Sequence, residues 1–248
     1  MPQQGLVTSG VVVERNFAIL PPEGIPESTL PAWRDTGARI LAAPAMGADF
    51  AMYLLDVKAG GGTQHALESD VECFFYCIEG EATLTLAAGA QPVRAGGYAY
   101  LAPGSAVTLA SRSGTRLIWL KKVYEPLSGV APRDVIGNES AIPGEPFMEV
   151  AELLLKKLLP DEAGFDMAMN IFTFPPGYSL PTTETHVMEH GLFFLQGAGD
   201  YYLGDAWREV QTGDFIWMGP YCPQGFLATG SQPARYIYYK NVHRDIEL

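Results

Sequence analysis

The stretch Glu184-Thr185-His186-Val187-Met188-Glu189-His190 concentrates side chains of the kind that bind metal ions. Successive side chains of an extended strand point to opposite faces, so Glu184, His186 and His190 would share one face. These two histidines are half of the four in the chain. Two imidazoles and one carboxylate suit a divalent transition metal, so the stretch predicts half of a metal site. The alternative for the stretch taken alone is a solvated strand edge.

An internal repeat surrounds this stretch. Near the end of each half, residues 116–123 return as residues 235–242, at an offset of 119. Such offsets, held over many landmarks, predict one β domain written twice. The landmarks 117 residues apart are Asp49-Phe50-Ala51-Met52 with Asp166-Met167-Ala168-Met169, Gly60 with Gly177, Gly80 with Gly197, Gly96 with Gly213, and Pro103 with Pro220.

Short apolar or alternating runs, divided by Gly and Pro turns, predict the secondary structure. Many short strands at regular spacing indicate an all-β fold, either a sandwich or a barrel. In the first half the runs are residues 39–42, 50–58, 73–78, 82–87, 98–101 and 117–123.

The predicted domain boundaries follow the turn residues and the repeat. Residues 149–159 carry conflicting signals, because their apolar residues fit a helical stripe. The repeat, however, places residues 156–159 over residues 39–42 and favours a strand for the later part, with a short helix before it as the alternative. The predicted segments are an N-terminal arm at 1–37 with a short strand at 11–13, an N-terminal domain at 38–125, a linker at 126–149 and a C-terminal domain at 150–248.

Composition excludes several classes of partner. The 248 residues carry a net charge of −12, which disfavours nucleic acid and anionic membranes as partners. No run approaches the length of a transmembrane helix, and the start lacks the pattern of a signal peptide. The spacing of Cys73, Cys77 and Cys222 fits no disulfide framework, so we expect buried thiols and a cytoplasmic location.

The repeat provides an internal comparison for the metal site. Residues 117 positions before the three ligand-type residues are Leu67, Ser69 and Cys73, which do not form a ligand set. His65 lies nearby, but it lacks the companions that a metal needs. We therefore expect a metal-free N-terminal domain and a C-terminal domain that carries the chemistry.

The motif spacing of the C-terminal half resembles that of the cupin superfamily. The pattern Glu184-x-His186-x3-His190-x6-Gly197 is similar to the first cupin motif, with Glu and His exchanged at two ligand positions. In the second motif Gln224 stands where His is usual. These departures resemble the (S)-ureidoglycine aminohydrolase family of two-domain cupins, most closely over residues 183–242.

The resemblance implies a fold, a metal and a reaction. The implied fold is a bicupin, two tandem jelly-roll β-barrels assembled into a homo-oligomer. The implied metal is Mn²⁺ held by Glu184, His186, His190 and Gln224, an oxygen-leaning set unlike the thiolate-rich sets that select zinc. The family reaction converts (S)-ureidoglycine and water to (S)-ureidoglycolate and ammonia in allantoin and purine breakdown.

Further side chains are implied to contact the small-molecule substrate. Besides Glu184 and Gln224, these are Tyr236 and Lys240, which share one face of a predicted strand with Tyr238. Tyr201 is an additional candidate for the pocket wall.

We expect Lys240 to bind the substrate carboxylate and Glu184 to shuttle the proton, so that both are catalytic. The alternative for Lys240 is a structural role, because Lys121 occupies the equivalent repeat position.

Two other functions stay open at this point. Two histidines and a carboxylate also describe a non-haem iron oxygenase. A cupin can also bind a small molecule without turning it over. Metal content, oxygen uptake and ammonia release distinguish the three.

Overall fold

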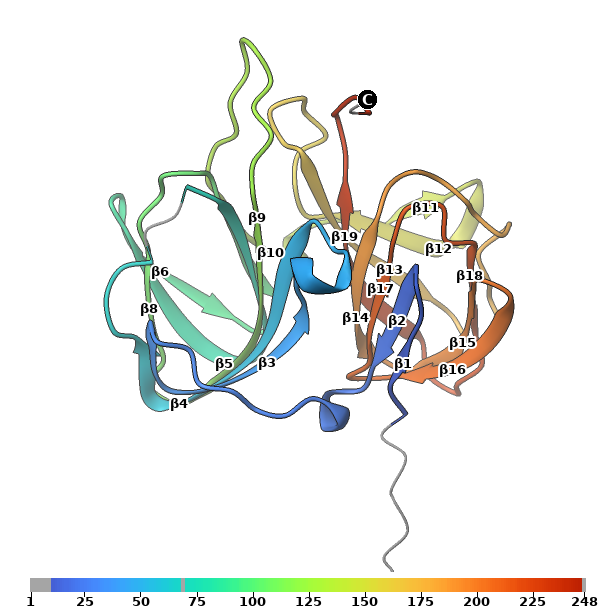
Figure 1. Cartoon of the computed structure of the whole chain (residues 1–248), viewed down its shortest axis with the longest axis horizontal. Coiled ribbons are helices and arrows are strands. Elements are labelled where there is room, and N and C mark those ends of the chain that lie inside the picture. Colours follow the sequence, from blue (N-terminus) through green and yellow to red (C-terminus); the bar gives the residue numbers. More distant parts are fainter. Residues whose placement is uncertain (1–9, 68–69, 247–248) are drawn as a thin grey trace, which may run out of the picture.

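The computed structural model describes residues 10–67 and 70–246, and it is built almost entirely of β-strands. Two groups of strands lie side by side (Figure 1), which we call the N-terminal half, β3–β10, and the C-terminal half, β11–β19. The strands are β1 (Val12–Val13), β2 (Phe17–Leu20), β3 (Trp33–Ala42), β4 (Phe50–Thr63), β5 (Glu72–Leu86), β6 (Gly89–Arg94), β7 (Gly97–Leu101), β8 (Thr108–Ala110), β9 (Thr115–Lys122), β10 (Val135–Asn138), β11 (Glu145–Phe147), β12 (Val150–Lys157), β13 (Met167–Phe174), β14 (His190–Gln196), β15 (Ala198–Leu203), β16 (Ala206–Gln211), β17 (Phe215–Met218), β18 (Gln224–Ala228) and β19 (Ala234–Asn241). Three short 3₁₀ helices accompany them: η1 (Pro22–Gly24), η2 (Pro44–Met46) and η3 (Glu139–Ala141).

The strands of each half pair mainly with one another. In the N-terminal half, β4 and β5 each pair with both β8 and β9, so these four strands close a barrel. In the C-terminal half an eight-stranded sheet runs β1-β2-β17-β14-β19-β13-β12-β11, and a three-stranded sheet, β16-β15-β18, faces the cavity described below. The all-β prediction is confirmed.

The strand bounds follow the sequence repeat. β3 and β12, β4 and β13, and β6 and β16 begin 117 residues apart, and β9 and β19 begin 119 apart. The long strand β5 corresponds to two strands, β14 and β15, which are divided at Gly197. Gly197 has a φ of 80°, as has Gly80 inside β5, and this positive φ suits glycine. The repeat is therefore present in the structure, whereas the division into two domains stays a prediction.

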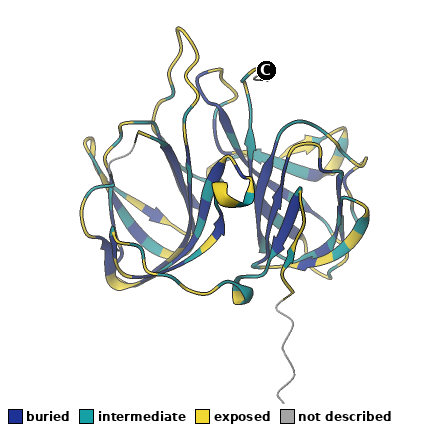
Figure 2. Ribbon diagram, in the orientation of Figure 1, coloured by how far each residue is buried: buried dark blue, intermediate teal, exposed yellow. Residues whose placement is uncertain are grey.

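Alternating side chains of the central strands face two different cores. In β4, Met52 and Leu54 belong to a core shared by both halves, whereas Leu55 belongs to the interior of the N-terminal half. In β19, Tyr239 faces the shared core and Tyr236 faces the interior of the C-terminal half. Buried residues accordingly line the strands where the halves meet (Figure 2). This alternation decides which side chains reach the cavity described below.

The arm predicted at residues 1–37 reaches across the C-terminal half before the chain enters the N-terminal half. Its described part begins at residue 10, and the predicted strand at 11–13 is confirmed as β1. β2, which was not predicted, pairs with β17. The chain then runs along the lower edge in Figure 1 to β3, which begins at Trp33. The predicted boundary at residue 37 therefore falls inside a strand.

The linker predicted at 126–149 contains strands from both halves. β10 pairs with β7 and extends the N-terminal sheet, whereas β11 pairs with β12 of the C-terminal sheet. Pro126 and Pro132 precede β10, and the intervening residues are irregular, as their prolines predicted. The predicted linker thus contains an irregular first part and two strands that were not predicted, and its role as a link between two domains stays a prediction.

Residues 150–157 form the strand β12, so the helical alternative for residues 149–159 is wrong. β11 and β12 are joined by Met148 and Glu149, whose φ angles are 48° and 66°. Two-residue hairpin turns commonly need positive φ at both positions. Residues other than glycine store about 1 kcal/mol or more of strain in this conformation.

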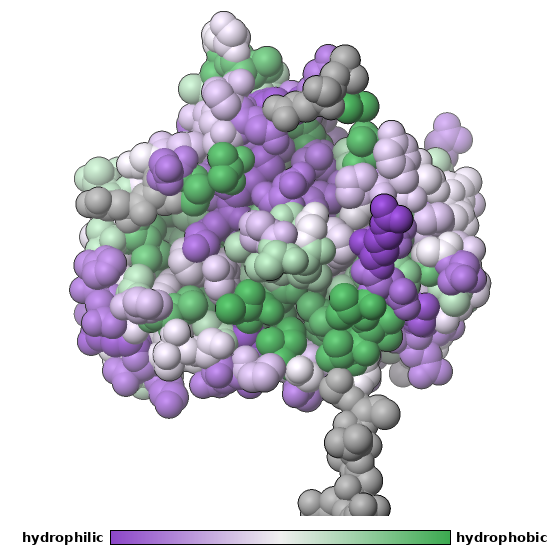
Figure 3. Space-filling view, viewed as in Figure 1, coloured by the Kyte–Doolittle hydropathy of each residue, from purple (hydrophilic) through white to green (hydrophobic). Residues whose placement is uncertain are grey.

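The face shown in Figure 3 is largely hydrophilic, with hydrophobic side chains gathered in its lower middle part.

All three cysteines are free and buried, as the sequence predicted. Among the described residues, no helix is both long enough and apolar enough to cross a membrane.

Candidate functional site

A cavity of about 160 Å³ lies inside the C-terminal half. Its size suits one small molecule, because pockets for drug-sized ligands are larger. The structure brings together every side chain predicted for the site, although their roles stay predictions. Lining this cavity are Glu184, His186, His190, Tyr201, Gln224, Tyr236 and Lys240, together with Phe147, Phe172, Leu180, Leu192, Met218 and Tyr238.

The stretch 184–190 is not the strand that its alternation predicted. Strand β14 begins only at His190, and the residues before it are irregular. Glu184 and Gln224 form an isolated bridge, in which each backbone N–H donates to the other's carbonyl oxygen at 2.8 and 3.0 Å. The carbonyl oxygen of His186 accepts from the N–H of Tyr221 at 2.8 Å. The side chains converge because this irregular segment docks on the loop before β18.

His186 and His190 point their ring nitrogens at each other, with 3.2 Å between the two Nε2 atoms. The Nδ1 atom of His186 lies 3.1 Å from the Met188 carbonyl oxygen, and that of His190 lies 3.1 Å from the Tyr239 carbonyl oxygen. A carbonyl oxygen only accepts, so each Nδ1 carries the proton and each Nε2 presents a lone pair. Two facing lone pairs repel unless a cation lies between them. Atoms bound to a metal at about 2.1 Å and at right angles lie about 3 Å apart, so the pair fits a metal ion.

Burial keeps His190 in this neutral form. Together with the nearby His186 and, to a smaller extent, Lys240, burial lowers the pKa of His190 to about 3. The hydrogen bond to the Tyr239 carbonyl acts in the opposite direction and is weaker. A neutral imidazole is the form that binds a metal, so His190 is competent at neutral pH.

Gln224 and Glu184, the other two predicted ligands, also lie near His186 Nε2. The Gln224 amide nitrogen lies 2.9 Å from His186 Nε2, and a half-turn of the amide would put its oxygen there instead. Glu184 Oε2 lies farther from the same nitrogen, at 4.0 Å. Within residues 10–67 and 70–246, no three His, Cys, Asp or Glu side chains already surround a common point. Metal binding therefore requires the part-exposed Glu184 carboxylate to rotate inward.

β19 supplies three neighbouring side chains of the cavity wall. Tyr236, Tyr238 and Lys240 share its interior face, as strand alternation predicted. Lys240 pairs with His190 across the β14–β19 ladder, which places its side chain beside the histidine pair. The rings of Tyr201 and Tyr236 lie with their centroids 6.2 Å apart. Burial raises the pKa of both tyrosines, so both remain neutral hydrogen-bond donors.

Three aromatic residues of the wall were absent from the predicted site. Tyr238 carried a signal, its place on the interior face of β19, and its ring packs edge-on against His190 with centroids 5.5 Å apart. Phe172 stacks on Tyr238 at 5.6 Å. Phe147 packs edge-to-face on Phe172 at 4.8 Å. It had no sequence signal, because it belongs to the predicted linker.

The equivalent place in the N-terminal half is apolar. Leu67 and Val107 form the isolated bridge there, with aliphatic side chains in place of a carboxylate and an amide. Lys121, the repeat equivalent of the cavity lysine, has its ammonium over the Trp119 ring, 4.7 Å from the centroid. Ser69 lies outside the described residues. The absence of metal from this half stays a prediction.

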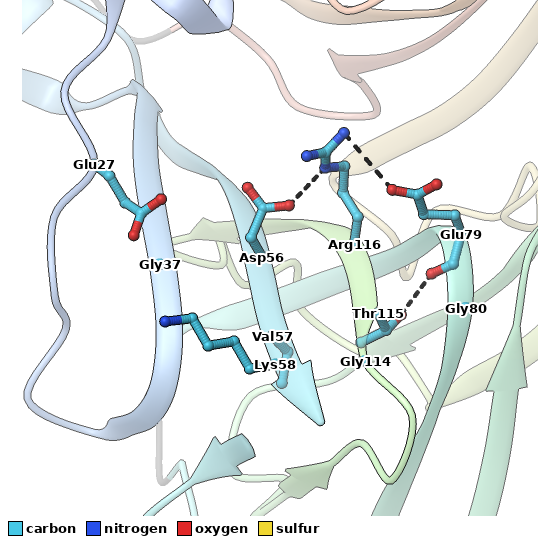
Figure 4. Close-up of a pocket in the computed structure, with 10 residues that line it drawn as sticks. All are labelled: Glu27, Gly37, Asp56, Val57, Lys58, Glu79, Gly80, Gly114, Thr115 and Arg116. Carbon is cyan, nitrogen blue, oxygen red and sulfur yellow. Dashed lines mark hydrogen bonds and ion pairs between the residues drawn. The ribbon is translucent and has the colours of Figure 1, made fainter. Parts of the chain in front are cut away.

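A larger pocket of about 400 Å³ lies in the N-terminal half (Figure 4). Arg116 bonds to Asp56 at 2.6 Å and approaches Glu79 at 3.6 Å. Arg39 also bonds to Asp56, at 2.8 Å. The charged groups of this pocket thus pair mainly with one another, and we assign no ligand to it.

Known proteins resemble this chain over nearly its whole length. The Cupin domain family model matches residues 170–239. The (S)-ureidoglycine aminohydrolase of Escherichia coli (strain K12) is 36% identical over 247 residues, which are 98% of this chain and 95% of that protein. The probable (S)-ureidoglycine aminohydrolase of Oryza sativa subsp. japonica is 36% identical over 241 residues, 94% of this chain and 75% of that protein. The crystal structure of protein Ylba from E. coli superimposes with a TM-score of 0.87 at 35% identity and covers 99% of both chains.

Proposed function

Because this chain belongs to the (S)-ureidoglycine aminohydrolase family of cupins, we propose that it converts (S)-ureidoglycine and water to (S)-ureidoglycolate and ammonia. We also propose that it needs Mn²⁺ for this reaction. The observation that supports both proposals is the cavity of the C-terminal half, where two imidazole lone pairs, an amide and a carboxylate face one another beside a lysine.

The proposed ligands of Mn²⁺ are Glu184, His186, His190 and Gln224. Oxygen and imidazole donors without a thiolate suit this ion. When bound, the ion would act as a Lewis acid that polarises and orients the substrate. In both histidines Nδ1 lies beside a backbone carbonyl oxygen, which leaves Nε2 of each ring to face the ion.

Lys240 is the proposed binding group for the substrate carboxylate. It extends into the cavity from β19 beside the histidine pair. An ammonium group in a small cavity gains a strong, charge-assisted hydrogen bond from a carboxylate. Tyr201, Tyr236 and Gln224 supply further polar contacts, because their side chains line the same cavity and both tyrosines are neutral.

The reaction replaces an amine on the central carbon by a hydroxyl group. The bond between that carbon and the amine nitrogen breaks, and a bond to the oxygen of water forms. The water loses a proton, and the amine gains one and leaves as ammonia. Glu184 is the proposed carrier of this proton, because its carboxylate lies at the cavity and can swing between positions.

The test is a stereospecific assay on the purified protein after treatment with a chelator, with and without added Mn²⁺. Ureidoglycine also decays in water without a catalyst, so the deciding readout is an excess of (S)-ureidoglycolate together with ammonia. Formation of the single enantiomer only with Mn²⁺ is the expected result. Oxygen uptake with iron would instead indicate an oxygenase, and binding without turnover would indicate a binding protein.

We further propose that the enzyme works in the cytoplasm as a homo-oligomer on a free small molecule. The net charge of −12 supports the absence of nucleic acid and membrane partners. Light scattering gives the mass of the assembly directly. A monomer at micromolar concentration would contradict the oligomer.

A further inference from the structure

The start of β4, in the N-terminal half, touches both chain neighbours of His190. The Asp49 N–H donates to Glu189 Oε1 at 3.0 Å. On the other side, the Phe50 ring lies so close to Gly191 that an added Cβ would overlap it. His190 is therefore held between two contacts to the opposite half of the molecule.

The same segment supports the backbone that orients the His190 ring. The rings of Phe50 and Tyr239 pack with centroids 4.5 Å apart, and Tyr239 is fully buried. The Tyr239 carbonyl oxygen accepts from His190 Nδ1, and the next residue is Lys240. A shift of Tyr239 would therefore move the imidazole and the ammonium group together.

Glu189 is fixed through its side chain and its backbone. Oε1 accepts from Asp49, and Oε2 accepts from Trp217 Nε1 at 3.1 Å. Its own N–H donates to Asn241 Oδ1 at 2.8 Å. Both carboxyl oxygens are needed as acceptors, because each faces a different N–H group. Glu189 thus links the N-terminal half to the residue that precedes His190.

We propose that residues 49 and 50 are positioning residues for His190 and Lys240. They act through Glu189, Gly191 and Tyr239, which they touch directly. The proposal rests on the proposed function, because it gives the N-terminal half a part in the reaction of the C-terminal cavity.

The repeat supplies a matched position for the test. Glu72 is the equivalent of Glu189, is fully buried, and accepts a hydrogen bond from Tyr100, the equivalent of Trp217. It is followed by Cys73, where Glu189 is followed by a histidine of the cavity. A change at Glu72 therefore perturbs the equivalent buried carboxyl, which lies near Asp166 of the C-terminal half, without adjoining the candidate metal site.

The contact between Gly191 and the Phe50 ring differs from its equivalent in the N-terminal half. Gly191 makes room for Phe50. The repeat equivalents are Phe74 and Met167, so in the N-terminal half the large ring belongs to the opposite strand of the pair. A glycine beside His190 thus goes together with a phenylalanine at the start of β4.

The first test is Glu189→Gln, with Glu72→Gln as its control. Glutamine turns one acceptor oxygen into an NH₂ group that faces an N–H donor. Groups that orient metal ligands typically change metal affinity 10- to 100-fold when they are altered. We therefore expect the Kd for Mn²⁺, measured from the electron paramagnetic resonance signal of free Mn²⁺, to rise at least about tenfold in Glu189→Gln. In Glu72→Gln it should stay at the wild-type value.

A second pair of variants, Phe50→Leu and Met167→Leu, keeps the proposal testable if Glu189→Gln does not fold. At position 50 leucine fills most of the space of the Phe50 side chain but loses the ring contact with Tyr239. Phe50→Leu should weaken Mn²⁺ binding and raise KM for ureidoglycine, whereas Met167→Leu should change only the midpoint of thermal unfolding.

The outcomes separate the two proposals. Wild-type Mn²⁺ affinity and kcat/KM in both Glu189→Gln and Phe50→Leu would overturn the positioning role and leave the proposed function intact. Equal loss of affinity in Glu72→Gln would also overturn it, because any loosening of the halves would then suffice. A wild-type protein that neither binds Mn²⁺ nor forms (S)-ureidoglycolate would overturn the proposed function itself.

Discussion

Replacing Lys240 by Met tests how the substrate carboxylate is bound. Methionine keeps the long apolar stem in the cavity wall and removes the ammonium group. A hydrogen bond to a charged group typically contributes about 1.5–3 kcal/mol. We therefore expect kcat/KM for (S)-ureidoglycine to fall about 10- to 150-fold, since each 1.4 kcal/mol is a factor of ten.

The same change should leave the metal in place. The Lys240 charge disfavours positive charge at His190 and contributes to the low pKa of that imidazole. Without this charge the imidazole still stays neutral, because burial is the largest cause of the lowered pKa. The cavity also becomes less repulsive to a cation. The Kd for Mn²⁺ should therefore be unchanged or lower.

Lys121→Met is the matched control. Lys121 lies over the Trp119 ring, so its replacement should lower the unfolding free energy by about 0.5–1 kcal/mol. Turnover should stay unchanged. Initial rates of (S)-ureidoglycolate formation at saturating Mn²⁺ compare the two variants. Wild-type turnover in Lys240→Met would refute carboxylate binding by Lys240. A parallel loss of Mn²⁺ would instead show that the lysine is structural.

Three further results are expected. Phe147→Ala removes a ring from the cavity wall and should raise KM about tenfold while improving the relative kcat/KM of bulkier ureido acids, measured by competition. Burial and the neighbouring Asp166 raise the pKa of Glu72 to about 9 from 4.5, so its contribution to stability is complete below pH 4.5 and is lost as pH rises through 9. The unfolding free energy should accordingly fall by about 1 kcal/mol per unit between pH 7 and 9, and urea titrations of Glu72→Gln should show a flatter profile. Mn²⁺ at 100 times its Kd should add about 2.7 kcal/mol to the unfolding free energy, and His186→Ala should abolish the corresponding rise in the thermal midpoint.

The repeat made the fold predictable where local patterns misled. The apolar residues Val150, Leu153, Leu154 and Leu158 fit a helical stripe, yet residues 150–157 pair with β11 and β13 as a strand. Pairing on both sides satisfies the backbone of the segment, and this outweighs the local periodicity. The offset of 117 carried that information, because the strand at the equivalent place is β3. The predicted linker repeats the arm, since Val135 pairs with Tyr100 as Ala18 pairs with Trp217, but neither β2 nor β10 was predicted.

Residue type, spacing and the family resemblance identified the members of the cavity but not the reason they meet. Strand alternation was the wrong cause for Glu184 and His186, which are placed by backbone bonds to Gln224 and Tyr221. Such contacts join segments about 35–40 residues apart and leave no local pattern. Alternation was the right cause on β19, which continues as a regular strand through Lys240. Phe147 could not be predicted, because its place depends on how the hairpin folds back over the cavity.

Differences between the two copies separate the cavity from the contact between the halves. At the cavity positions the N-terminal copy has Leu67 and Val107, since aliphatic side chains gain stability from burial where unused polar ligands would lose it. At the contact between the halves both copies have a buried carboxyl, Glu72 and Glu189, each receiving a hydrogen bond from an aromatic side chain. A ligand set matters only to the half that binds, whereas each contact between the halves serves both. The buried carboxyls are therefore present in both copies, whereas the predicted ligand set is present only in the C-terminal copy.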